Sequence, residues 1–148
     1  MNPFRILIVD ANPQAGASLR VQLRELGFEV AETVAVDGAL SLAASFKPAV
    51  VLLDLSAPGC DGATFVADLR AIGSNASVVV VSGEAEAEAA AALAALGAGA
   101  DGYLLRPLQA DRLRAAVERA SERRALRLEI SGLRERVRGR LALIGASP

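Results

Sequence analysis

Four polar residues with complementary chemistry stand directly after short apolar runs in this sequence. They are two carboxylates, a hydroxyl and a guanidinium: Asp10, Asp54, Ser82 and Arg106. Two neighbouring carboxylates repel each other unless a cation lies between them, and hard oxygen ligands of this kind suit magnesium. An aspartate can be the nucleophile in phosphoryl transfer, while a hydroxyl and a fixed positive charge contact the phosphoryl oxygens. Each residue alone has an ordinary structural explanation, but together they predict a phosphoryl site.

Five continuously apolar runs, rich in β-branched residues, are typical of buried parallel strands. They are Ile6 to Val9, Val30 to Val34, Val50 to Leu53, Val78 to Val81 and Tyr103 to Leu105. Their alternation with helical patterns predicts an α/β fold, a doubly wound five-stranded parallel sheet with the flavodoxin-like order 2-1-3-4-5. Ligands of such sheets bind at the carboxyl ends of the strands, and the four polar residues stand at or just after those ends.

The helical segments have recognisable beginnings. Asn12 is placed to cap the first helix before Pro13, and Asp37 is placed to cap the second. The other helices are expected at about residues 63–72, at the alanine-rich residues 85–96, and from about Asp111 onward.

Composition removes several classes of function. With one cysteine, Cys60, and no histidine, the chain has no internal disulfide, no histidine-based metal site and no histidine-based nucleophilic triad. No apolar run reaches the roughly 18 residues of a membrane span, and no signal-peptide pattern is present. We therefore expect a cytoplasmic protein without membrane contact. Aromatic residues make up only 3% of the chain, which disfavours stacking on single-stranded nucleic acid.

The C-terminal segment differs in charge from the rest of the chain. Residues 1–110 hold six basic and twelve acidic side chains, whereas residues 111–148 hold ten arginines and five acids. Glutamates are interleaved with these arginines, which favours a solvated helix with ion pairs over direct nucleic-acid binding by this segment.

An apolar seam follows the same segment. Leu126, Ile130, Leu133 and Val137 fall on the a and d positions of a heptad repeat. So short a coiled coil is marginal alone, and dimerisation would need additional surface from the globular domain. We expect a domain at residues 1–120, a helical linker or coiled coil at residues 121–148, and a homodimer.

The quoted motifs resemble those of response-regulator receiver domains in two-component signalling. The resemblance covers about residues 4–120 in order and spacing. It is carried by four stretches: Ile6–Asp10, Asp54–Gly62, Val81–Gly83 and Tyr103–Pro107. The second stretch is highly specific for this family.

The resemblance implies roles for individual residues. Asp54 is the implied phospho-acceptor, and the implied magnesium ligands are Asp10, Asp54 and the backbone carbonyl of Ser56. Ser82 is the implied switch hydroxyl, Tyr103 the aromatic residue that changes rotamer on activation, and Pro107 follows a peptide bond that receivers usually hold in cis. A sensor histidine kinase or a small phospho-donor is the implied source of the phosphoryl group.

Two positions depart from the family pattern. Receivers normally have two adjacent acids after the first strand, but Ala11 follows Asp10 here. Receivers also have a lysine after the fifth strand, and Arg106 stands in that position here. The chain's one lysine, Lys47, precedes the third strand and so lies at the opposite end of the sheet. Because Ala11 removes an acid that usually contacts the metal, we expect weakened magnesium binding. A guanidinium cannot copy the contact that an ammonium makes, so we also expect an altered phosphoryl contact at Arg106.

Two functional interpretations stay open, and neither is an enzyme. The first is a phosphoryl-accepting receiver that relays phosphorylation at Asp54 to an output module or partner, with transcription regulation as the favoured output. The alternative is a phosphorylation-independent pseudo-receiver that acts as a dimerisation module. An aspartate-nucleophile phosphatase would need a second acid two residues after Asp54, where Ser56 stands.

The last residues, Leu143–Pro148, resemble the opening of the ATPase domain in NtrC-type transcriptional activators. This resemblance implies that the chain is the receiver and linker of such an activator.

Overall fold

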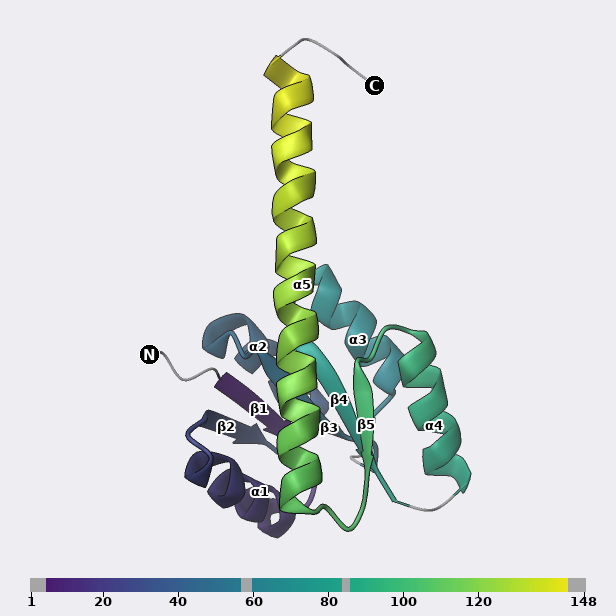
Figure 1. The fold of residues 1–148 in the computed structure, drawn as a ribbon. Helices are drawn as coiled ribbons and strands as arrows, with labels where there is room; N and C mark the ends of the chain where they lie inside the picture. The colour runs from purple at the N-terminus through teal and green to yellow at the C-terminus, as the bar shows by residue number, and fades with distance from the viewer. Residues whose placement is uncertain (1–4, 57–59, 84–85, 144–148) are drawn as a thin grey trace.

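Five parallel strands form the sheet at the centre of the computed structural model, which describes residues 5–56, 60–83 and 86–143 (Figure 1). The strands are β1 (Arg5–Val9), β2 (Glu29–Thr33), β3 (Val50–Asp54), β4 (Ser77–Ser82) and β5 (Gly102–Leu105). They lie in the order β2-β1-β3-β4-β5, and every neighbouring pair is parallel. The predicted fold class and strand order are confirmed.

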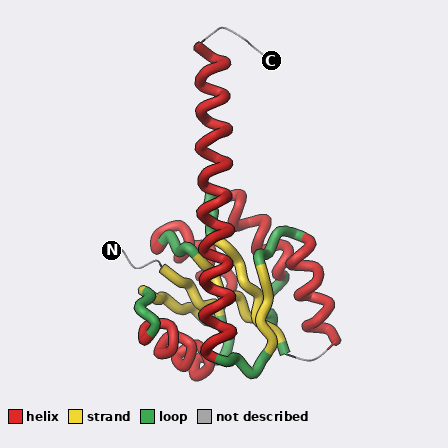
Figure 2. Tube along the Cα trace, viewed as in Figure 1, coloured by secondary structure: helices red, strands yellow, loops and turns green. Residues whose placement is uncertain are grey.

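Helices cover both faces of the sheet (Figure 2). On one face lie α1 (Pro13–Glu25) and α5 (Ala110–Leu143), and on the other lie α2 (Val36–Phe46), α3 (Gly62–Ala71) and α4 (Glu86–Gly97). Alternate residues of each central strand enter opposite core layers, so both faces of the strand are buried. Continuous apolar sequence is required for that environment, which is why the runs were recognisable.

Two local expectations differ from the structure. Asp37 does not cap α2, because the helix begins at Val36 after Ala35, which makes no side-chain capping bond. Asp37 lies inside the first turn, where a carboxylate is favoured by the helix dipole instead. The strand β2 ends at Thr33, and Val34 beyond it is 52% exposed. Asn12 does cap α1, since its side chain accepts hydrogen bonds from the amides of Gln14 and Ala15.

The last helix is far longer than the sheet requires. α5 has 34 residues without interruption, which corresponds to about 50 Å at the usual helical rise. Its first half packs on the sheet and its second half projects away from the domain (Figure 1). The predicted extended C-terminal helix is confirmed as far as Leu143. Residues 144–148, with most of the stretch that resembles NtrC-type activators, lie outside the described residues, as do Ala85 and residues 57–59.

A buried carboxylate joins this helix to the start of β5. The side chain of Asp101 is 1% exposed and forms ion pairs with Arg123 at 3.0 Å and with Arg127 at 2.6 Å. It also accepts a hydrogen bond of 2.9 Å from the amide of Val78 and lies 3.9 Å from a guanidinium nitrogen of Arg70. We call Asp101, Arg70, Arg123 and Arg127 the Asp101 cluster.

Arg127 extends the attachment of α5 to the neighbouring strand. Its second terminal nitrogen donates to the carbonyl of Asn75 at 3.0 Å and to the hydroxyl of Ser77 at 2.6 Å. Ser77 is fully buried and donates in turn to the carbonyl of Ala120. The contacts that hold α5 to the domain therefore continue at least to Arg127.

Candidate functional site

The strand register brings the four polar residues to one edge of the sheet. Val9 pairs with Leu53, so Asp10 and Asp54 follow on adjacent central strands. Asp54 pairs with Val81, and Ser82 pairs with Leu105, so Ser82 and Arg106 continue the row. The reversal of strand order around β1 and β3 places the two aspartates at the switch point, where doubly wound sheets bind their ligands.

Asp54 is a buried carboxylate with several hydrogen-bond donors. Its side chain is 4% exposed. Oδ1 accepts from the amide of Ser56 at 3.0 Å and from its hydroxyl at 2.8 Å, and pairs with Nη1 of Arg106 at 3.1 Å. Burial alone would raise the pKa of Asp54, but the Ser56 amide and the Arg106 guanidinium outweigh it and lower the pKa below its ordinary value. A carboxylate with a lowered pKa is ionised at neutral pH.

Asp10 is equally buried but less favourably placed. Its side chain is 2% exposed. Oδ1 accepts from the amide of Asn12 at 2.9 Å, and Oδ2 pairs with Nη2 of Arg106 at 3.1 Å. Burial raises the pKa of Asp10, and the nearby carboxylate of Asp54 adds to the rise, against the opposing effects of the Asn12 amide and Arg106. The two carboxylates thus have pKa values displaced in opposite directions.

Arg106 lies between the two aspartates. One terminal nitrogen of its guanidinium meets Asp54 and the other meets Asp10, each at 3.1 Å, while the side chain is 32% exposed. Its own amide donates to the carbonyl of Ser82 at 2.9 Å, which fixes the backbone of Arg106 beside the end of β4. The sequence indicated a cation between the carboxylates, and the structure places a side chain of this chain there.

The arrangement does not fit a magnesium ion unless Arg106 moves. Magnesium favours about six oxygen ligands at about 2.0–2.1 Å in octahedral geometry. Asp10 and Asp54 have suitable oxygens, but each carboxylate has one of them directed at Arg106. Ala11 supplies no ligand, and among residues 5–56, 60–83 and 86–143 no group of three or more His, Cys, Asp and Glu side chains could hold a metal ion.

The remaining site residues flank this cluster. Ser82 is 1% exposed at the end of β4, and the amide of the following Gly83 donates to the carboxylate of Glu88 in α4. Tyr103 is 56% exposed on β5. The peptide bond between Arg106 and Pro107 is cis, as the resemblance implied.

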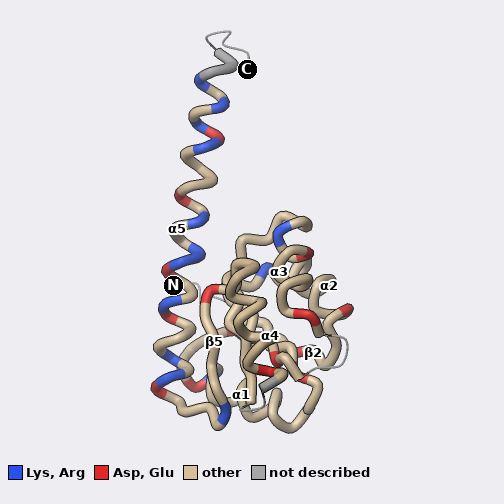
Figure 3. Tube along the Cα trace, turned by 90° about the vertical axis from the view of Figure 1, so that its right-hand side faces the viewer, with Lys and Arg blue, Asp and Glu red and all other residues tan. Residues whose placement is uncertain are grey.

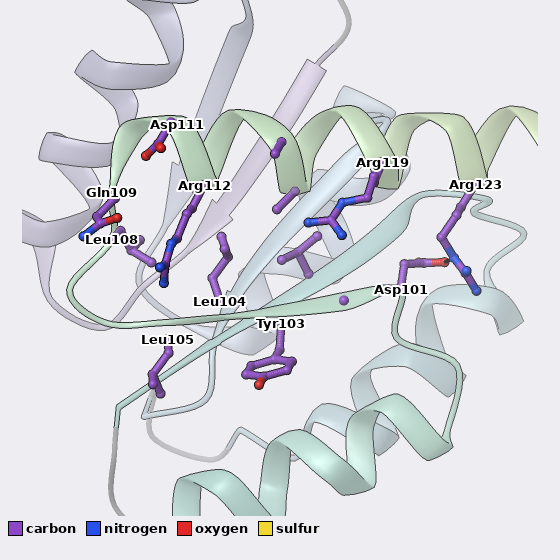
Figure 4. A pocket seen from close by; sticks show the side chains of 14 residues that line it. Asp101, Tyr103, Leu104, Leu105, Leu108, Gln109, Asp111, Arg112, Arg119 and Arg123 are labelled. Carbon is purple, nitrogen blue, oxygen red and sulfur yellow. Dashed lines mark hydrogen bonds and ion pairs between the residues drawn. The ribbon is translucent and has the colours of Figure 1, made fainter.

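A hollow of about 820 Å³ lies between β5 and α5, away from the carboxylates. Tyr103 and Leu105 line it from β5, and Arg112 and Arg119 extend toward it from α5 (Figure 4). Its lining does not include Asp10 or Asp54, so we assign the chemistry to the strand ends and not to this hollow.

Comparison with known proteins identifies the family of this chain. Residues 6–118 match the family model of the response regulator receiver domain. The transcriptional regulatory protein PrrA of Mycobacterium tuberculosis is 36% identical in an alignment of 151 positions, gaps included. The alignment covers 91% of this chain and 63% of PrrA. The transcriptional regulatory protein KdpE of the same species is 38% identical over 118 residues, which cover 77% of this chain and 51% of KdpE. The chain thus spans about half to two thirds of these relatives.

Solved structures share the fold over most of the chain. NtrX from Brucella abortus superposes with a TM-score of 0.77 at 30% identity, over 92% of this chain and 30% of NtrX. The structure of FixJ-N gives a TM-score of 0.74 at 27% identity, over 82% of this chain and 96% of its own. With the family match over residues 6–118 and the strand order described above, these likenesses establish that the chain belongs to the response-regulator receiver family.

Proposed function

We propose that Asp54 accepts a phosphoryl group from a sensor histidine kinase or a small phospho-donor in the cytoplasm, and that the phosphorylated receiver acts on an output module or partner. The observation that carries the proposal is a buried, ionised carboxylate at the switch point of the sheet with a guanidinium 3.1 Å away. PrrA and KdpE are transcriptional regulatory proteins by name, so regulation of transcription is the output that we propose.

The chemistry follows from the donors around Asp54. Its Oδ1 is held by Ser56 and Arg106, whereas Oδ2 accepts from the hydroxyl of Ser56 at 2.8 Å, which leaves Oδ2 more freedom to attack phosphorus. The new Asp54 oxygen–phosphorus bond forms as the bond from phosphorus to the donor breaks, and the donor leaves with that electron pair. Arg106 and the hydroxyl of Ser82 would then neutralise or bind the phosphoryl oxygens.

Receiver domains generally bind magnesium, and we propose that this one does so weakly. Asp10, Asp54 and the backbone carbonyl of Ser56 are the proposed ligands. Ala11 removes the second acid of the usual pair, and Arg106 contacts the oxygens that the metal needs.

Restoring the family residues should strengthen this site. The double variant Ala11→Asp and Arg106→Lys has the second carboxylate after β1, and a compact ammonium replaces the guanidinium that bridges Asp10 and Asp54. We expect magnesium affinity about tenfold higher than in the parent, because loss or gain of a supporting group changes metal affinity by roughly that factor or more. Phosphorylation by a small phospho-donor should also become faster. Equal magnesium affinities in calorimetric titration would show that neither departure limits binding.

A second candidate function is a pseudo-receiver that works without phosphorylation. The bridging of both carboxylates by Arg106 favours it, because the site is already neutralised in part by the chain itself. The two candidates differ in one measurement, the mass of the chain after incubation with a phospho-donor.

We further propose that the chain forms a homodimer through α5. The seam residues are exposed along α5 from Leu126 onward: Leu126 by 57%, Ile130 by 40%, Leu133 by 53% and Val137 by 56%. Acidic and basic residues alternate along the same part of the helix (Figure 3). An exposed apolar stripe flanked by charges is typical of a helix that pairs with another helix.

Charges placed in the seam should weaken the dimer. We expect Leu133→Lys with Val137→Lys to raise the dimer dissociation constant about tenfold or more, since lysine at such positions is desolvated on pairing. Glu135→Lys is the control, because it adds positive charge to the same turns outside the seam. Sedimentation velocity at matched concentrations measures the effect. A parent chain that stays monomeric at high micromolar concentration would contradict the pairing.

A further inference from the structure

Asp10 and Asp54 place two buried carboxylates side by side at the ends of adjacent strands. The side chains of Asp10 and Asp54 are 2% and 4% exposed, and they follow paired residues on adjacent strands. Two carboxylates in such a position would repel each other, and burial would add to the cost of keeping both ionised. Without a cation the pair would bring two negative charges to the centre of the sheet edge.

We infer that Arg106 is a built-in counter-ion that occupies the place of the divalent metal, so that the acidic pair is stable without one. The guanidinium meets both carboxylates through different nitrogens at equal distances of 3.1 Å. A planar fork can bridge two acceptors in this way, whereas a lysine ammonium is a single point charge on a flexible stem.

The backbone supports this placement. The amide of Arg106 donates to the carbonyl of Ser82, so the residue is fixed at the end of β5 while its side chain turns back over the carboxylates. The Arg106 side chain is 32% exposed, so it is more accessible to solvent than either carboxylate. A divalent cation would bind the same two carboxylates, and Arg106 already engages one oxygen of each. We therefore expect metal binding to be coupled to displacement of Arg106.

This inference rests on the proposed site but not on its phosphorylation, and thermal unfolding tests it. The full chain, Arg106→Gln and the control Arg114→Gln are heated in a chelator and in excess magnesium, with ionic strength matched. Arg114 is a suitable control because its pair with Glu118 is exposed, by 61% and 59% respectively. In the chelator we expect Arg106→Gln to melt about 5 °C or more below the parent, because its two acids are no longer neutralised.

Magnesium should raise the unfolding midpoint of Arg106→Gln most of the way back to that of the parent. It should leave the midpoints of the parent and Arg114→Gln almost unchanged. A parent midpoint that rises with magnesium as much as that of the variant would overturn the inference. So would equal midpoints of parent and Arg106→Gln in the chelator, or a variant that magnesium does not rescue.

A second variant keeps the test decisive if Arg106→Gln does not fold in the chelator. Adding Asp10→Asn removes one of the two charges, so the double variant should fold without metal and lose the response to magnesium. Failure of the double variant to fold would also overturn the inference. None of these readings involves a phosphoryl group, so they stay valid whether or not Asp54 is phosphorylated.

Discussion

Intact mass spectrometry of the chain after incubation with a small phospho-donor and magnesium should show the addition of one phosphoryl group, and Asp54→Asn should abolish it. Asp54 is the proposed nucleophile at the switch point, and an amide in its place cannot form the acyl phosphate. The expected effect is complete loss of the adduct. Far-ultraviolet circular dichroism should show that the variant is folded.

Asp61→Asn is the matched control for this experiment. Asp61 follows Asp54 in the same connection and caps α3 through the amides of Ala63 and Thr64, a role that asparagine also performs. The control variant should keep the adduct. An adduct that persists in Asp54→Asn would place the acceptor elsewhere, and no adduct in the parent would favour the pseudo-receiver.

Substitution of Asp101, the buried acid just before β5, should lower the free energy of unfolding more than loss of an exposed ion pair does. Asp101→Ala leaves the amide of Val78 without its carboxylate acceptor and removes the buried carboxylate that pairs with Arg123 and Arg127. Breaking a buried ion pair by removing one partner costs about 3–5 kcal/mol, and we expect about 3 kcal/mol, because the arginines regain contact with water. Urea unfolding followed by circular dichroism measures the free energy of unfolding.

Glu118→Ala on the same helix is the control for Asp101→Ala. Its ion pair with Arg114 is largely exposed, so its loss should change the free energy of unfolding by less than about 0.5 kcal/mol. Similar free energies for the two variants would show that the Asp101 cluster contributes little to stability.

The sheet could be predicted from sequence because its central strands are buried on both faces. Val50–Asp54 and Ser77–Ser82 are buried at every position, and such strands need nearly continuous apolar sequence. The edge strand β2 is more polar, and its apolar pattern predicts an end at Val34, one residue beyond the observed end at Thr33. The prediction that Asp37 caps α2 is wrong because an aspartate in the first turn has the same sequence signature as an aspartate that caps.

The acids of the site could be located from sequence, and a cation between them could be expected, but its identity as Arg106 could not be predicted. Strand ends fix where Asp10 and Asp54 lie, whereas the direction of a long side chain such as Arg106 depends on the folded surroundings. No sequence motif predicts the Asp101 cluster. Asp101 stands in a loop, and its partners Arg123 and Arg127 are separated from it by 22 and 26 residues without a motif.

The uninterrupted course of α5 has a consequence for geometry beyond the domain. Arg127 fixes the helix against the sheet, and no break in the helix separates it from Leu143. Successive side chains of an α-helix point in directions about 100° apart around the helix axis. The contacts that fix α5 on the receiver therefore also fix the direction of every side chain further along the helix. One residue inserted after Arg127 would rotate Leu133 and Val137 by that angle about the helix axis. In a paired helix, the same phase would determine which faces of the two receivers point toward each other.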